Sequence, residues 1–387
     1  MSRPEAAGSG ELPRRRTALR LRFLIPLAVL ALLSPAIYSW TRMALRPSSL
    51  PLGVRSVEWL RMNHLNWLVD DAEHVYYSWR APAKGGPQLT TLPKVGLPTK
   101  PKAARKPWPP PIQPVFARPL RGEGIWKPTG PPVAGRPPVL VTTFRTERDY
   151  PRIVAYAAWF DHTRTALAYY PGRYEPPSAT LRGPLEVPWG QRWRLLATFN
   201  SGFIYMDGLN GDALDGVVNE PLRDGLATLV AYRDGSVNIL SWKGRRAPSR
   251  GVVFARQSLP LIIDHGRLSP ALDDSSKWGF TLGNAVRVWR TGVGIDRRGN
   301  LVYAAADYQT VTTLARILQR AGAVRAMELD INPEWPTLIT YRHRHGLLPT
   351  RLVPNYQQPP TRYLVPDDRD FFAVYRRLPG PIAVPLK

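Results

Sequence analysis

Residues 290–335 carry the strongest local signals in this sequence, and they constrain the fold more than any other stretch. Two runs rich in β-branched and small apolar residues, Thr291–Ile295 and Leu301–Ala306, are separated by Asp-Arg-Arg-Gly-Asn at positions 296–300. That composition is typical of a turn between two strands. The stretch therefore predicts one antiparallel hairpin.

A helix and a further strand follow the predicted hairpin. Thr310 can cap a helix whose apolar residues recur at steps of three and four until Gly322 ends it. Residues Val324–Ile331 then return as a short strand. Because successive side chains of a strand point to opposite faces, Glu328 and Asp330 are expected on one face. The pattern thus predicts a helix packed on a sheet, with two carboxylates near a strand end.

Further strands are expected on both sides of this stretch. They are Val139–Phe144, Arg152–Trp159, Trp193–Phe199 and Phe371–Arg376. Hairpin signals outnumber strand–helix alternations, which favours the α+β class: a mixed, mainly antiparallel sheet with few packed helices. With 44% hydrophobic residues in a chain of 387, a sizeable core is possible. We place this domain at residues 139–387.

The N-terminus has the pattern of a membrane segment. A basic tail, residues 1–22, precedes an almost unbroken apolar run. Residues 23–42 are about long enough for one membrane-spanning helix at ~1.5 Å per residue, and the basic tail predicts a cytoplasmic N-terminus. A cleaved signal peptide is the alternative, but Tyr38 and Trp40 crowd the expected cleavage site. We therefore expect a single-pass signal anchor in the cell membrane, with the C-terminal domain extracytoplasmic.

Two segments separate this anchor from the domain. Residues 43–80 contain a helical pattern from Ser56 to Trp79, rich in Trp and Tyr, which suits either the membrane surface or packing on the domain. Residues 81–138 are rich in Pro and Lys and predict an extended linker. The positive charge of this linker suits contact with anionic wall polymers, although a solvated basic spacer is the simpler interpretation.

The net charge of +24 does not by itself indicate a nucleic-acid binder. Residues 1–138 carry 21 Lys and Arg against 7 Asp and Glu, whereas residues 139–387 carry 32 against 22. Over half of the excess therefore lies outside the predicted domain, and we expect no nucleic-acid partner. The absence of cysteine excludes disulfides, a thiol nucleophile and a cysteine metal site.

Several short blocks resemble the phosphodiester glycosidase family in both order and spacing. They are Phe199-Asn200-Ser201-Gly202-Phe203, Arg290-Thr291-Gly292-Val293-Gly294-Ile295-Asp296, Ala321-Gly322-Ala323 and Leu329-Asp330. The resemblance covers roughly residue 139 to the C-terminus. Where the family has a glycine run after the aspartate, this chain has Ile331-Asn332-Pro333-Glu334-Trp335.

The resemblance implies a hydrolase that cleaves a sugar-1-phosphodiester bond, which we place in a cell-envelope glycan. It also implies that Asn200 lines the glycan phosphodiester pocket. Such a reaction needs a carboxylate beside an oxocarbenium-like centre, and Arg or amide donors for the phosphate. We therefore expect Asp330 to act as nucleophile or base, Arg290 to hold the phosphate and Asn200 to orient the sugar.

The full set of candidate residues comprises a catalytic and a substrate-binding group. The catalytic candidates are Asp330, Glu328 and Glu334, and the substrate-binding candidates are Asn200, Ser201, Gly202, Arg290, Asn332 and Trp335.

Some of these residues also have structural interpretations. Asn200 suits an Asx turn, Trp335 suits a core aromatic, and Arg290 suits an ion pair with Glu328 inside the sheet. The acidic residues at 207–220 do not have EF-hand spacing. We expect no metal and no cofactor.

Three function classes follow from these features. The first is a membrane-anchored extracytoplasmic hydrolase of phosphodiester-linked glycans. The second is a catalytically inactive envelope protein of the same fold that binds glycan, suggested by the lost glycines. The third is a basic nucleic-acid binder, whose binding would weaken steeply with salt.

Overall fold

The computed structural model describes most of the chain. The described residues are 14–48, 50–98, 108–208, 210–244, 246–274, 277–278, 287–354 and 358–378. They divide into two compact units, one formed by residues up to 47 together with 52–66, and the other by residues 48–51 and 67 onward.

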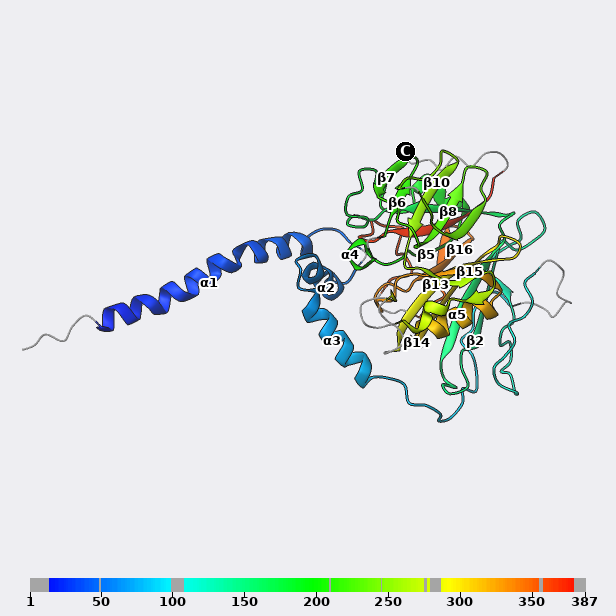
Figure 1. Cartoon of the computed structure of the whole chain (residues 1–387), viewed down its shortest axis with the longest axis horizontal. Coiled ribbons are helices and arrows are strands. Elements are labelled where there is room, and N and C mark those ends of the chain that lie inside the picture. The colour runs from blue at the N-terminus through cyan, green and yellow to red at the C-terminus, as the bar shows by residue number, and fades with distance from the viewer. Residues whose placement is uncertain are drawn as a thin grey trace, which may run out of the picture. The chain divides into compact units, whose positions relative to one another are not determined.

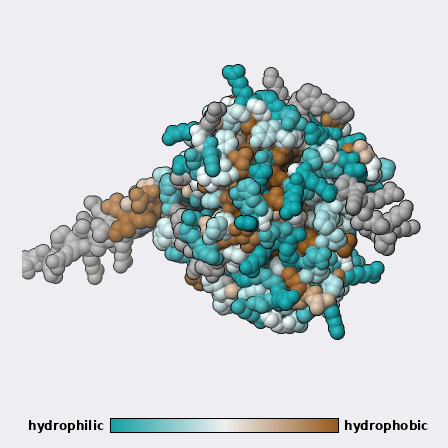
Figure 2. Space-filling model, turned by 45° about the vertical axis from the view of Figure 1, so that its right-hand side comes forward, coloured by the Kyte–Doolittle hydropathy of each residue, from teal (hydrophilic) through white to brown (hydrophobic). Residues whose placement is uncertain are grey.

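The first unit contains α1 (Arg14–Ala44) and α2 (Leu52–Met62). Residues 24–44 of α1 have a mean hydropathy of 1.7 and are not buried, which fits either a signal anchor or a signal peptide. In Figure 2 the described apolar residues of this helix form a brown stretch, whereas the visible face of the second unit is largely hydrophilic. The Arg55 guanidinium donates to the carbonyls of Ala44 (3.1 Å) and Met43, which satisfies the free carbonyls at the end of α1.

The pattern at 56–79 predicts one helix, but the structure has two. The helix α2 ends at Met62, and α3 (Asn66–Trp79) starts four residues later. The break has a local cause: His64 adopts a φ of 61°, and the Leu65 amide bonds back to the Leu60 carbonyl at 3.0 Å. A left-handed residue with such a bond is a common way to end a helix.

The second unit is built from three sheets, and every pairing among the described strands is antiparallel (Figure 1). The eight-stranded sheet runs in the order β1 (Lys127–Pro128), β2 (Val139–Arg145), β3 (Val154–Phe160), β14 (Leu301–Gln309), β13 (Val288–Asp296), β15 (Ala323–Glu328), β11 (Leu261–Asp264) and β12 (Arg267–Leu268).

Two five-stranded sheets complete the unit. One has β7 (Val217–Glu220), β6 (Asp212–Leu214), β10 (Val252–Gln257), β8 (Ala227–Tyr232) and β9 (Val237–Ser241). The other has β17 (Leu347–Arg351), β16 (Leu338–His343), β5 (Leu195–Asn200), β18 (Phe371–Arg376) and β4 (Thr165–Tyr170). Short helices are η1 (Trp189–Arg194), α4 (Tyr205–Gly208) and η2 (Pro270–Asp273), and the longer one is α5 (Val311–Arg320). The predicted α+β class with mainly antiparallel sheets is confirmed.

The central hairpin forms as predicted, from β13 and β14. At its turn the Asp296 carboxylate accepts from the amides of Arg298 (2.8 Å) and Asn300 (2.9 Å), while Gly299 adopts a φ of 83°. The helix α5 then starts at Thr310, whose side chain and that of Thr313 cap each other's backbone amides. Its buried apolar face covers the sheet.

The strand β15 ends earlier than the predicted Val324–Ile331. It stops at Glu328, because the next two amides leave the ladder. The Leu329 amide bonds to the Thr291 carbonyl at 2.8 Å, and the Asp330 amide bonds to the Ser201 carbonyl at 3.1 Å. Asp330 therefore lies in a loop that is fastened to the end of β5.

Part of the segment predicted as a linker packs on the second unit. Ile112 and Trp126 are buried, and the Trp126 ring nitrogen donates to the Pro110 carbonyl at 3.0 Å. The Arg145 guanidinium of β2 donates to both carboxylate oxygens of Glu123, at 3.0 and 2.8 Å, in a fully buried pair. Residues 108–128 are thus folded against the sheet, while the domain boundaries remain a prediction.

Replacing Gly292 with Ala tests how tightly α5 lies on β13. A Cβ atom there would lie 2.8 Å from Leu318 Cδ1 and 3.0 Å from the Met327 carbonyl. We expect G292A to lower the free energy of unfolding by about 1–3 kcal/mol, because overpacking strains the layer. Urea unfolding followed by Trp fluorescence measures it. The control is G251A, whose Cβ would meet nothing within 4 Å; equal stability of the two variants would contradict the prediction.

Candidate functional site

Three segments that are far apart in sequence meet at the end of β5. They are Asn200–Gly202, the start of β13 at Thr291, and the loop that begins at Asp330. The Thr291 hydroxyl donates to the Asp330 carbonyl at 2.8 Å and accepts from the Asn200 amide nitrogen at 2.9 Å. The structure therefore places Asp330 next to Asn200, as the sequence hypothesis requires.

The side chain of Asn200 is 3% exposed and joins these segments. Its amide nitrogen also donates to the Ser201 carbonyl (3.0 Å). Its oxygen accepts from the Tyr303 hydroxyl at 2.8 Å and from the Thr337 amide at 3.1 Å. Both ends of the amide are thus engaged by other segments. This pattern is a junction between strands, not an Asx turn.

Arg290 and Glu328 form a sealed pair within the sheet. Their side chains have no exposed surface, and the Arg290 guanidinium donates to the Glu328 carboxylate at 2.5 Å and to the Gln309 carbonyl at 3.1 Å. Burial raises the Glu328 pKa to about 7, although Arg290 opposes this shift. This is the arrangement in which Arg290 bridges Glu328 inside the sheet. Neither side chain reaches the surface where a substrate would bind.

The carboxylate of Asp330 has a different cationic partner, Arg369. One guanidinium nitrogen of Arg369 lies 2.6 Å from Asp330 Oδ2, and each side chain keeps 8% of its surface exposed. The second carboxylate oxygen accepts from the Asn332 amide at 3.0 Å. Asp330 is therefore held by one charge-assisted bond and one backbone bond.

Trp335 supports this pair from below. Its ring is 1% exposed, and the guanidinium carbons of Arg369 and Arg362 lie 4.8 and 5.0 Å from the ring centre. Earlier in the same loop, the Asn332 side-chain oxygen accepts from the Glu334 amide at 3.1 Å. The chain thus fills the position of the family's glycine run with a packed aromatic ring, as the core interpretation of Trp335 predicts.

The segment that carries Arg369 is pressed against Gly172. A Cβ atom at Gly172 would lie 2.3 Å from the Arg369 carbonyl carbon and 2.6 Å from the Asp368 carbonyl oxygen. The amides of Arg173 and Tyr174 bond to the carbonyls of Asp367 and Asp368, at 3.1 and 3.0 Å. The backbone of residues 172–174 therefore fixes where Arg369 begins.

Ser201 and Gly202 face the end of β10. A Cβ atom at Gly202 would lie 3.1 Å from the Ser258 side chain, so the two segments are in contact. The hydroxyls of Ser201 and Ser258 are buried and have no hydrogen-bond partner among the described residues. Two unsatisfied hydroxyls at a buried junction suit a site that receives a polar ligand or water.

A buried charge network beside this junction escaped the sequence analysis. Arg256 of β10 donates to the Asp370 carboxylate at 2.7 Å and to the Phe203 carbonyl at 2.9 Å, and lies 3.6 Å from Glu175. The Tyr169 hydroxyl also donates to Asp370, at 3.0 Å. The network thus orders the backbone after Asn200 from behind. Its one visible sequence signal is the Asp-Asp-Arg-Asp run at 367–370.

Two carboxyls of this network have raised pKa values. Burial raises the Glu175 pKa to about 8 and the Asp212 pKa to about 6, with Arg256 opposing both shifts. One guanidinium therefore does not offset the burial of these acids.

The acidic residues expected from 207–220 do not cluster. Asp207 lies in α4, Asp212 is buried in β6, and Asp215 occupies a turn with a φ of 48°. Across the part of the chain that the structure describes, no group of three His, Asp or Glu side chains is placed to hold a metal ion.

Comparisons with known proteins add to this geometry. Residues 200–330 match the family model of the phosphodiester glycosidases. This stretch starts at the Asn200 junction and ends at Asp330, and the resemblance predicted from the sequence is confirmed there. Arg369, the partner of Asp330, lies outside it. No curated protein matches the chain.

Two solved structures resemble the chain. One is the catalytic domain of zebrafish N-acetylglucosamine-1-phosphodiester α-N-acetylglucosaminidase, auto-inhibited by its pro-peptide, with 14% identity, a TM-score of 0.43, and 64% of this chain and 86% of that chain covered. The other is a hypothetical protein from Synechocystis, with 13% identity, a TM-score of 0.39, and 64% of each chain covered.

Removing one member of the sealed pair should cost more than removing both. We expect R290L to lower the free energy of unfolding by about 3–5 kcal/mol, because it leaves Glu328 buried without its cation. The double variant R290L/E328L should recover most of this loss, since two apolar groups replace two desolvated charges. Urea unfolding of the two variants and of E328L completes the cycle. Additive losses would contradict the prediction.

The raised pKa of Asp212 predicts a pH-dependent stability. Its ordinary value of 3.8 rises to about 6 in the fold, so the folded state binds more protons between those values. The stability it contributes is present below about pH 4 and lost as the pH rises to about 6. D212N should remove about 3 kcal/mol of the decline in unfolding free energy between pH 4 and pH 7. Parallel curves for the variant and the wild type would show that Asp212 does not titrate this way.

Proposed function

We propose that this protein hydrolyses a sugar-1-phosphodiester bond in a cell-envelope glycan, from an extracytoplasmic domain anchored by α1. The observation that carries the proposal is the Asp330–Arg369 pair. It joins a partly exposed carboxylate to a partly exposed guanidinium, and it lies at the end of the stretch that matches the family.

The reaction matches the charges of this pair. Water is consumed, the bond between the anomeric carbon and the phosphate oxygen breaks, and the products are a free sugar and a phosphate monoester. The departing phosphate carries its negative charge stably, so a strong general acid matters less than in other glycosidases. Asp330 acts as nucleophile or base at the anomeric carbon, where it stabilises the positive charge of the transition state.

In this proposal Arg369, and not Arg290, holds the phosphate. Its guanidinium lies beside the Asp330 carboxylate and keeps some exposed surface, whereas that of Arg290 keeps none. Arginine binds phosphate oxygens through paired N–H donors. Arg290 and Glu328 then serve as positioning residues that fix β13 against β15.

The remaining candidates keep supporting roles. Asn200 holds the three segments together, and Ser201 and Gly202 line the junction beside Ser258. Asn332 orients Asp330 through its backbone amide, and Glu334 is the candidate acid on the same loop. Trp335 acts as the platform beneath Arg369.

A catalytically inactive glycan-binding protein is the second candidate. The observation that favours it is the buried Trp335 ring, which stands where the family has glycines. Glycines allow close backbone approach, whereas this loop fills that space and leaves Asp330 already paired with a cation. Such a protein would bind glycan without turning it over.

The D330N variant tests the first candidate. With the full chain in detergent and a GlcNAc-1-phosphodiester as substrate, we expect the release of free sugar to fall by about a thousandfold, because Asn cannot act as nucleophile or base. D264N, which removes an exposed carboxylate on β11, should leave turnover unchanged. Unfolding curves check that D330N remains folded.

Each outcome of this experiment decides between the candidates. Turnover by the wild type that persists in D330N would reject the role of Asp330. No turnover by the wild type, together with retained binding of the same substrate, would support the inactive binding protein.

A further inference from the structure

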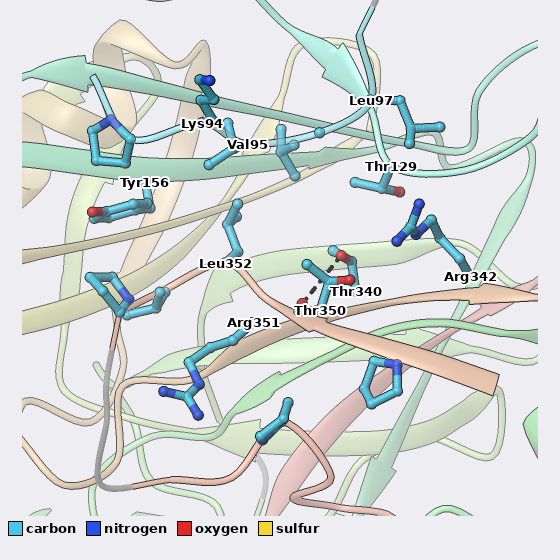
Figure 3. A pocket seen from close by; sticks show the side chains of 17 residues that line it. Lys94, Val95, Leu97, Thr129, Tyr156, Thr340, Arg342, Thr350, Arg351 and Leu352 are labelled. Carbon is cyan, nitrogen blue, oxygen red and sulfur yellow. Dashed lines mark hydrogen bonds between the residues drawn. The ribbon is translucent and has the colours of Figure 1, made fainter. Parts of the chain in front are cut away.

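A cavity of about 560 Å³ lies outside the candidate site. None of its lining residues is among the predicted site residues, and none belongs to the stretch 200–330 that matches the family. We call it the groove. Its residues come from positions 93–97, from β1 and its flanks, from β2 and β3, and from β16, β17 and the loop that follows (Figure 3).

One wall of the groove is a Pro-rich segment held by backbone contacts. The Leu97 amide donates to the Pro128 carbonyl at 2.7 Å, and the Thr143 hydroxyl donates to the Pro93 carbonyl at 3.3 Å. Gly96, with a φ of 66°, lies so close that an added Cβ would be 2.7 Å from Lys127 Cβ. This wall is therefore a built part of the unit.

The opposite wall is the β16–β17 hairpin. Thr340 pairs with Thr350 in the ladder, and Arg342 and Arg351 flank them (Figure 3). Thr340 lies only three residues beyond Thr337, which is bonded to Asn200. At ~3.3 Å per residue of strand, that separation is about 10 Å. A polymer in the candidate site therefore has the groove within reach of its next units.

The chemistry of the groove is divided between its floor and its rim. The floor is apolar and consists of buried side chains, among them Val141, Leu352 and Val353. The rim carries Lys94, Arg342 and Arg351 together with three threonines, and no Asp or Glu lines the groove. Such a site suits a ligand that alternates compact apolar faces with negative charges.

We propose that the groove binds a further segment of a phosphodiester-linked anionic glycan. The rim cations contact its phosphates, the threonine hydroxyls contact its sugar or polyol hydroxyls, and the floor contacts its carbon skeleton. The choice of a glycan among polyanions rests on the proposed function. A single-stranded nucleic acid fits less well, because such strands stack on several aromatic rings and the groove lining contains one, the buried Tyr156.

Binding of a fluorescently labelled poly(glycerol phosphate) to the full chain in detergent tests the groove. We expect R342Q/R351Q to weaken binding about tenfold or more, since two charge-assisted contacts are lost. The matched control is K243Q/R297Q, which removes the same charge from exposed positions outside the groove and should change binding by less than about twofold. K94Q, at an exposed rim residue, should give an intermediate loss without affecting folding.

Three further measurements complete the test. Neutral dextran should not displace the probe, and turnover of a small GlcNAc-1-phosphodiester should be the same in R342Q/R351Q as in the wild type. Equal weakening by the groove and control variants would overturn the proposal, because binding would then follow net charge alone. Displacement of the probe by oligothymidylate at lower concentration than by unlabelled polymer would overturn it in favour of nucleic acid. If small-substrate turnover is absent but groove-dependent binding persists, only the proposed hydrolysis fails.

Discussion

The arrangement of the candidate site depends on one buried amide, that of Asn200. Its four hydrogen bonds connect the end of β5 to β13, to β14 and to the residue before β16. A buried polar group that loses its partner costs about 1–3 kcal/mol, so each of these bonds restricts where the segments can lie. The Thr291 hydroxyl extends the junction to the Asp330 carbonyl. The position of Asp330 is thereby tied to a residue 130 positions earlier in the chain.

Around this junction, four guanidinium–carboxylate pairs are buried or nearly so. They are Arg290–Glu328, Arg256–Asp370, Arg362–Asp367 and Arg369–Asp330. Such pairs add little net stability, because desolvation offsets attraction, but the loss of one partner is costly. The raised pKa values of Glu175 and Glu328 show how strongly burial acts here. Of the four pairs, Asp330–Arg369 keeps the most exposed surface, which is why we assign the chemistry to it.

The sequence predicted the local elements well and the long-range partners poorly. Turn chemistry at 296–300 and the Thr310 cap act over a few residues, so the hairpin and helix could be predicted from pattern alone. The end of β15 could not, because it depends on a bond from the Asp330 amide to Ser201 in another sheet. Arg369 also escaped, because no local pattern links it to a carboxylate 39 residues earlier. Composition likewise suggested an extended form for residues 108–128, whose burial depends on the Glu123–Arg145 pair.

The close approach of Gly172 to the Arg369 backbone has an evolutionary consequence. Any side chain at position 172 would push away the carbonyl group of Arg369, and the guanidinium would move from Asp330 with it. Among descendants of a common ancestor, a substitution at position 172 is therefore tolerated most easily once Arg369 is no longer under selection. The two positions should covary, and a glycine retained at 172 would mark those lineages in which the Arg369–Asp330 pair has been kept.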